Sequence, residues 1–212
     1  MQSMNNLAPT DHLNGTKSPS GPTPADVERW RSYLGICPDQ SKLSYDHQTR
    51  LAFTKMFYQY QLDGAYLFHM TVTYKSYQSI PYSPKITNDF FINFYLKNFL
   101  PYLLGTKNIH KRRFMQPICF AFLDEHESVP TKMTKDFMFP EKLHHHAVLA
   151  VHRNIVPFMR RMLGENMIGY SLKYSSKVMT THIRECDPMV SLYATKRLRQ
   201  YPEYLVFPDR LH

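Results

Sequence analysis

Short apolar runs rich in β-branched and aromatic residues predict several strands. Such runs are typical of sheet strands, and they occupy residues 66–75, 116–123 and 143–151, with a further strand or hairpin within 167–183. In the third run, three consecutive histidines lead directly into a continuous apolar stretch. Because alternate residues of a strand share a face, we expect His144 and His146 on one face and His145 on the opposite one.

Apolar residues at helical spacing predict helices between these strands. The predicted helices span residues 23–34, 44–61, 87–104, 155–164 and 187–199. The first and last begin with a capping residue followed by proline, which is typical of helix starts, and Thr87 or Asn88 is the expected cap of the third. The proline-containing segments 77–85 and 128–142 are expected to be loops.

Composition sets the domain organisation. The first 22 residues are poor in apolar side chains and rich in Asn, Ser, Thr, Gly and Pro, which predicts a disordered tail. Residues 23–212 then suit one folded domain. The three cysteines are far apart in the chain, so they predict no disulfide framework and favour the reducing cytoplasm. Neither a membrane span nor a secretory signal is expected.

The charge and aromatic content favour a nucleic-acid partner. The chain has a formal net charge of +9 and 14% aromatic residues, and basic side chains neutralise phosphates while aromatic faces stack on bases. Many ordinary basic proteins share this composition. The most basic local cluster contains Lys107, Lys111, Arg112 and Arg113. We interpret this cluster as a phosphate contact, and a solvated charged loop is the alternative.

Candidate metal ligands surround the histidine strand. Imidazole nitrogen is a common ligand of transition metals, so His144 and His146 on one face could bind a single ion. Asp124 and Glu125, with Glu127 behind them, follow the 116–123 strand and could supply a carboxylate ligand. The alternative is a strand that begins in a polar loop, with its histidines solvated at the edge.

Three segments together resemble a known superfamily. An aromatic, threonine-rich strand (68–73), the His-x-His strand and a Tyr-x-x-Lys sequence (193–196) occur in the order found in HUH endonucleases. The tyrosine follows the histidines, as in rolling-circle replication initiators of plasmids and single-stranded DNA viruses and in single-strand transposases, whereas it precedes them in relaxases. The resemblance implies an α+β domain with a central antiparallel sheet of about five strands flanked by helices.

The resemblance also implies roles for individual residues. His144, His146 and a carboxylate, Asp124 or Glu125, would bind Mn²⁺ or Mg²⁺, while Tyr193 would be the nucleophile that forms a 5′-phosphotyrosine and Lys196 its helper. Tyr170 and Tyr174 also begin Tyr-x-x-Lys sequences and remain alternative nucleophiles. We prefer Tyr193, because residues three apart on a helix share a face. The chain departs from the family pattern at His145, where an apolar residue is usual.

The implied function is metal-dependent nicking and joining of single-stranded or origin DNA during rolling-circle replication. The basic residues 107–113, with Arg197 and Arg199, would hold the single strand. No Gly-x-x-x-x-Gly-Lys-[Ser/Thr] sequence is present, so a host helicase and polymerase would be partners. The alternatives are a non-catalytic origin-binding protein and a single-strand transposase of the same fold.

Overall fold

The computed structural model of the chain describes residues 25, 44–76, 83–126, 139–140, 142–161 and 178–208. The predicted tail, nearly all of the predicted helix 23–34, Glu127, and the alternative nucleophiles Tyr170 and Tyr174 lie outside the described residues. Within the stretches that are described, no helix has both the length and the apolar character needed to span a membrane.

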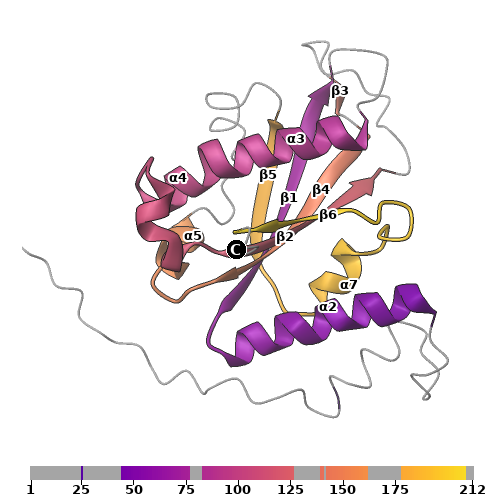
Figure 1. Cartoon of the computed structure of the whole chain (residues 1–212), viewed down its shortest axis with the longest axis horizontal. Coiled ribbons are helices and arrows are strands. Elements are labelled where there is room, and N and C mark those ends of the chain that lie inside the picture. The colour runs from indigo at the N-terminus through magenta and orange to yellow at the C-terminus, as the bar shows by residue number, and fades with distance from the viewer. Residues whose placement is uncertain are drawn as a thin grey trace, which may run out of the picture.

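An antiparallel sheet forms the centre of the fold (Figure 1). Its strands cross it in the order β5-β1-β4-β2-β6, every neighbouring pair is antiparallel, and the two-residue β3 pairs with the end of β1. The histidine strand β4 is therefore the central strand. The prediction of an α+β fold with such a sheet, flanked by helices, is confirmed. The strand bounds are β1 (Tyr66–Ser76), β2 (Ile118–Glu125), β3 (Phe139–Pro140), β4 (Leu143–Val151), β5 (Val178–Glu185) and β6 (Tyr204–Phe207).

A continuous helical segment covers one face of this sheet (Figure 1). It consists of α3 (Pro84–Phe94), the π-helix η2 (Tyr95–Phe99) and α4 (Leu100–Leu104). The aromatic and leucine side chains of this segment form the main core with one face of β1 and with the odd-numbered residues of β4. The β1 residues in this core alternate along the strand and so share one face: Phe68, Met70, Val72 and Tyr74.

The start of this helical segment differs from the prediction. Ser83, not Thr87 or Asn88, is its N-cap, and the Ser83 hydroxyl accepts a hydrogen bond from the Ile86 N–H at 3.3 Å. Pro84 then occupies the first helical turn, where its missing N–H costs nothing. Residues 84 and 85, which the prediction places in a loop, are therefore helical. The other end is as expected, because Gly105 adopts the left-handed conformation (φ 61°) that terminates helices.

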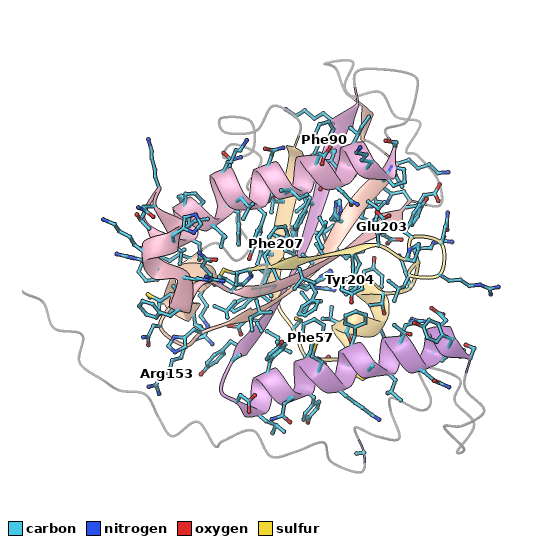
Figure 2. The ribbon with its side chains drawn as sticks, viewed as in Figure 1. Phe57, Phe90, Arg153, Glu203, Tyr204 and Phe207 are labelled. Atoms are coloured by element: carbon cyan, nitrogen blue, oxygen red, sulfur yellow. The ribbon has the colours of Figure 1, made fainter. Side chains whose placement is uncertain are left out.

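Two helices lie over the opposite face (Figure 1). They are α2 (Tyr45–Leu62), close to the predicted 44–61, and α7 (Val190–Ala194). Phe57 of α2 is fully buried against the even-numbered residues of β4 and packs edge-to-face on Phe120 at 5.4 Å (Figure 2). Two hydrogen bonds join the helices: Thr54 Oγ1 to Ser191 Oγ at 2.7 Å, and Arg50 Nη2 to the Leu192 carbonyl at 2.6 Å.

The last predicted helix is shorter in the structure than in the prediction. Asp187 caps the turn that precedes α7, because its Oδ1 accepts the Met189 N–H at 2.8 Å. The helix itself contains five residues, and turns follow it through Gln200. Three further elements complete the described chain: the 3₁₀-helix η3 (Ile109–Met115), α5 (Val156–Arg161) within the predicted 155–164, and β5, which overlaps the end of the predicted 167–183 segment.

Candidate metal centre

Three buried side chains converge on one point between β4 and β2. In the antiparallel register His144 lies opposite Asp124, so that both side chains and His146 share a face of the sheet. The Asp124 Oδ2 atom lies 3.0 Å from His146 Nε2 and 3.4 Å from His144 Nε2. The two Nε2 atoms are 3.1 Å apart. All three residues are buried, and their ligand atoms form a cluster that could hold a metal ion.

The chemistry of this donor set fits a divalent metal ion. Two imidazole nitrogens and one carboxylate oxygen are ligands that such ions accept, with the remaining positions left for water or substrate. Burial lowers the pKa of His146 below its usual value, despite the opposing effect of Asp124. His146 is therefore neutral at pH 7, as a metal ligand must be.

Charged side chains from the segment after α7 neutralise Asp124. Lys196 Nζ lies 2.8 Å from Asp124 Oδ2, and Arg197 Nε lies 3.9 Å from Oδ1. Burial by itself would raise the pKa of Asp124, but hydrogen bonds from His144, His146 and Lys196 hold it well below its usual range. Burial likewise opposes the charge of Lys196, and contact with Asp124 raises the Lys196 pKa above its usual value. Asp124 and Lys196 are thus both ionised at neutral pH.

Three residues that the sequence did not identify as part of the site support the two histidines. His69 Nε2 and Thr71 Oγ1, both on β1, each lie 3.2 Å from His146 Nδ1. Burial, and next the proximity of His146, lower the pKa of His69 to about 3. His126 stacks on His144 with ring centroids 3.9 Å apart. Contacts of this kind fix the orientation of metal-binding imidazoles.

Tyr193 lies directly beside this cluster. Its ring centroid is 4.7 Å from that of His146 and 6.0 Å from that of His69. The Lys196 ammonium lies 4.4 Å from the Tyr193 ring centroid. Tyr193 is 39% exposed, whereas the ligand residues are buried. The structure therefore brings together the tyrosine, the lysine and the two histidines that the sequence singled out, with Tyr193 reachable from solvent.

Glu125 does not join the converging side chains. It forms an ion pair with Lys142 and accepts hydrogen bonds from Gln200 Nε2 at 2.9 Å and Tyr201 Oη at 3.0 Å. Adjacent residues of β2 point to opposite faces, so the Glu125 carboxylate points away from the His144–His146 pair. The contacts with Lys142, Gln200 and Tyr201 hold it there. Of the two adjacent carboxylates that the sequence left open, Asp124 is the one in the cluster.

His145 occupies the opposite face, as strand alternation predicts. Its Nδ1 lies 2.6 Å from Tyr74 Oη, its Nε2 lies 2.9 Å from Asn88 Oδ1, and its ring packs 4.7 Å from that of Phe91. Burial lowers the pKa of His145 to about 3, and the neighbouring histidines add to this effect. His145 is therefore a neutral core residue that joins β4 to β1 and α3.

The basic residues divide between two regions. Lys107 precedes η3, and Lys111, Arg112 and Arg113 lie on it; all four are exposed. This group lies beyond the start of β2, whereas Asp124 lies near its end, so that the strand separates them by roughly 20 Å at about 3.3 Å per residue. Arg112 also caps α4, because its Nη1 donates to the Leu104 carbonyl at 2.6 Å. By contrast, Arg197 lies beside Asp124 at the candidate metal centre, and Arg199 follows it two residues later in the chain.

No family model, curated protein or solved structure matches this chain. The features that point to a function are therefore in the chain's own residues: a buried cluster of two histidines and an aspartate that could bind a metal ion, with a half-exposed tyrosine beside it.

Proposed function

We propose that this protein is a rolling-circle DNA replication initiator that nicks and rejoins single-stranded DNA through a covalent tyrosine intermediate. The observation that carries the proposal is the position of the Tyr193 ring, 4.7 Å from the ring of His146, one of the three candidate metal ligands.

In this proposal, His144, His146 and Asp124 hold a divalent ion, Mn²⁺ or Mg²⁺, which would polarise the scissile phosphate. The Tyr193 hydroxyl loses its proton and attacks phosphorus; the P–O3′ bond breaks and the O3′ leaving group takes up a proton. The products are a 5′-phosphotyrosine and a free 3′-hydroxyl. Attack of a 3′-hydroxyl on the phosphotyrosine reverses these steps and rejoins a strand without ATP.

Lys196 supplies the charge that this reaction needs. Tyrosine has an ordinary pKa near 10, so the attacking phenolate requires stabilisation. The Lys196 ammonium lies close to the Tyr193 ring and is kept protonated by Asp124. It can therefore stabilise the phenolate or the negative charge that develops on the phosphate.

The test is covalent capture. The full chain is incubated with Mn²⁺ and a library of random single-stranded oligonucleotides, and the modified residue is mapped by mass spectrometry. We expect an adduct on Tyr193 that Tyr193→Phe and EDTA abolish. The matched control is Tyr102→Phe, because Tyr102 is an exposed tyrosine on α4.

Each other outcome bears on a different part of the proposal. An undiminished adduct in Tyr193→Phe, mapped to Tyr170 or Tyr174, would overturn the choice of nucleophile. DNA binding without any adduct would favour a non-catalytic origin-binding protein. Rejoining that requires a dimer and hairpin-flanked ends would favour a single-strand transposase. Stimulation by a host helicase and polymerase on a circular template would support the assignment to replication.

A further inference from the structure

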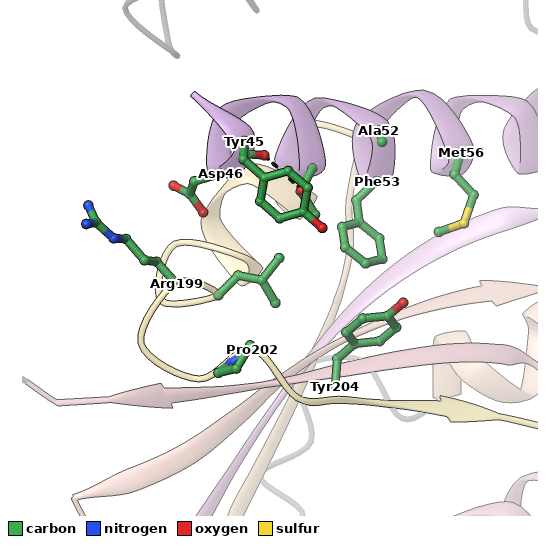
Figure 3. A pocket seen from close by; sticks show the side chains of 10 residues that line it. Tyr45, Asp46, Ala52, Phe53, Met56, Arg199, Pro202 and Tyr204 are labelled. Carbon is green, nitrogen blue, oxygen red and sulfur yellow. Dashed lines mark hydrogen bonds between the residues drawn. The ribbon is translucent and has the colours of Figure 1, made fainter. Parts of the chain in front are cut away.

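A groove of about 690 Å³ lies between α2 and the chain that follows α7 (Figure 3). Its volume is within the roughly 300–1,000 Å³ of small-molecule sites. None of the candidate metal ligands lines it. Its wall residues on α2 include Tyr45, Phe53 and Met56, and those after α7 include Leu198, Arg199 and Tyr204.

The apolar floor of the groove is rigidly supported. Phe53 packs edge-to-face against Tyr204 at 5.2 Å and against Phe122 at 5.0 Å. Tyr45, at the first turn of α2, is 84% exposed, and Tyr204 is 44% exposed. Two tyrosine rings therefore remain available at the groove above a buried aromatic layer. Such rings are suited to stacking on a flat, apolar ligand.

Two charged side chains, Asp46 and Arg199, line the groove. Figure 3 shows Asp46 and Arg199 on the same side of it. Neither side chain forms a hydrogen bond or an ion pair with any residue that the structure describes. A carboxylate accepts hydrogen bonds from amino groups, and a guanidinium donates to ring nitrogens and carbonyl oxygens. Stacking faces beside a free acceptor and a free donor match the chemistry of a nucleobase.

One segment of the chain, from α7 to Leu198, connects the candidate metal centre to the wall of the groove. The turns that follow α7, the helix that carries Tyr193, continue through Leu198, whose N–H bonds to the Thr195 carbonyl at 3.0 Å. Arg50 and Thr54 of α2 fix α7 through the hydrogen bonds described above. One side of α2 thus positions the segment that carries Tyr193, and the adjacent side forms the groove wall. The intervening Lys196 and Arg197 are basic, as a DNA backbone requires.

We propose that this groove binds one unstacked nucleobase of single-stranded DNA, close to the phosphate held at the metal centre. Tyr45 and Tyr204 stack on the base and Arg199 donates to its edge. Asp46 accepts from an exocyclic amino group, so the groove favours cytosine or adenine over thymine, which lacks one. This inference rests on the proposed function, because it assumes a single-stranded DNA substrate.

The test measures binding without cleavage. Anisotropy of labelled 12-nucleotide oligo-dC and oligo-dT is recorded with the full chain in EDTA. We expect Tyr45→Ala to weaken oligo-dC binding about tenfold, since the base loses one of its stacking partners. Arg199→Ala should weaken oligo-dC binding a few times more strongly than Arg153→Ala does. Arg153 is an exposed arginine after β4, so its variant is the control for the loss of one charge. Tyr102→Ala is the aromatic control.

The Asp46→Ala variant tests base preference, which is a more specific property of the groove than affinity. Removing a carboxylate raises DNA affinity in general, so the informative quantity is the ratio of oligo-dC to oligo-dT affinity. We expect this ratio to exceed about threefold in the unaltered chain and to fall to about one in Asp46→Ala, since that variant lacks the acceptor for the exocyclic amino group. An oligonucleotide carrying 5-iododeoxycytidine should, on irradiation, crosslink to Tyr45 or Tyr204.

Three outcomes would overturn the groove assignment. They are unchanged oligo-dC binding in Tyr45→Ala, a base preference that Asp46→Ala leaves intact, and crosslinks that map outside the groove. Self-association of the chain that Tyr45→Ala abolishes would show instead that a second copy occupies the groove. The adduct assay is independent: groove variants with weakened binding but no adduct in the unaltered chain would refute nicking and leave the base site standing.

Discussion

The two faces of β4 carry the same residue type in opposite roles. On one face, His144 and His146 turn their Nε2 atoms toward Asp124, with Lys196 and the half-exposed Tyr193 nearby. On the other, His145 is fully buried between β1 and α3. All three imidazoles are buried. What differs is the partner set: ionised groups and a route to solvent on one face, neutral hydrogen-bonding side chains on the other.

This difference predicts that function and stability depend on different members of three consecutive residues. The His144–His146 face leaves one buried polar atom unsatisfied: Nδ1 of His144 has no hydrogen-bond partner among the described residues. Such arrangements are costly and typical of functional sites. The His145 face satisfies both ring nitrogens. Substitutions on the first face should therefore affect metal binding and activity, and those on the second should affect folding.

The largest expected effect is on catalysis. His146→Ala should lower the rate of adduct formation by at least about 10³-fold, because a Lewis-acid metal supplies several kcal/mol and each 1.36 kcal/mol is a factor of ten. The circular dichroism spectrum should remain that of the unaltered chain. His152→Ala is the control, since His152 is exposed after β4. Adduct formation in His146→Ala at more than a tenth of the normal rate would contradict the metal assignment.

Part of this comparison could be predicted from the sequence, and part could not. The period of two along a strand is a local property, so the opposite orientations of His144 and His145 follow from the sequence alone. The choice between Asp124 and Glu125 depends on how β2 pairs with β4. The predicted strand stopped at Leu123, whereas the observed one continues to Glu125, which places Asp124 opposite His144.

The missed residues have the same physical origin. His69 and Thr71 reach His146 because β1 pairs with β4 in a register that places Thr71 opposite His146. The register between strands that are distant in the chain depends on which faces both strands bury together, so the pattern of one strand alone does not give it. The last predicted helix was too long for a related reason. Apolar spacing continues to Leu198, but the chain turns after Ala194 and carries Lys196 to Asp124.

The second prediction concerns the opposite face. His145→Leu should destabilise the protein by about 2–4 kcal/mol, because the Tyr74 hydroxyl and the Asn88 side chain lose their buried partner and each unsatisfied group costs about 1–3 kcal/mol. Urea unfolding in EDTA measures this change. Adduct formation per folded molecule should stay within a few fold of normal. A loss below about 0.5 kcal/mol would show that His145 is dispensable for stability.

A double-mutant cycle sharpens this prediction. Tyr74→Phe removes one hydroxyl and keeps the ring, so it should cost about 1–2 kcal/mol in the unaltered chain. In the His145→Leu background the same change should cost much less, since the hydroxyl no longer has its partner at 2.6 Å. Additive costs would mean that the Tyr74–His145 contact does not contribute to stability.

The third prediction extends the comparison to the adjacent carboxylates of β2. A metal ion that binds the folded chain stabilises it by RT ln(1 + [L]/Kd), about 2.7 kcal/mol at a hundredfold excess over Kd. Mn²⁺ should therefore raise the melting temperature of the unaltered chain and of Glu125→Gln, but not of Asp124→Asn. Calorimetric scans with and without Mn²⁺ measure this. Equal metal-induced shifts in all three proteins would place the ion elsewhere.

The smallest expected effect is on the pH dependence of the free energy of unfolding, which should differ between the unaltered chain and His145→Gln. Burial lowers the pKa of His145 to about 3 in the folded chain, whereas the unfolded value is about 6.5. Between these values the unfolded chain binds more protons, so the stability that the neutral imidazole contributes is complete above about pH 6.5 and is lost as the pH falls toward 3. The expected slope is up to about 1.4 kcal/mol per pH unit from this one group.

Urea unfolding in EDTA at several pH values between 4 and 6 should therefore show that stability depends less steeply on pH in His145→Gln, which cannot take up this proton. His69 behaves in the same direction in both proteins, so their difference isolates His145. Equal slopes would mean that His145 titrates normally in the folded chain, and the contrast between the two faces of β4 would lose its electrostatic basis.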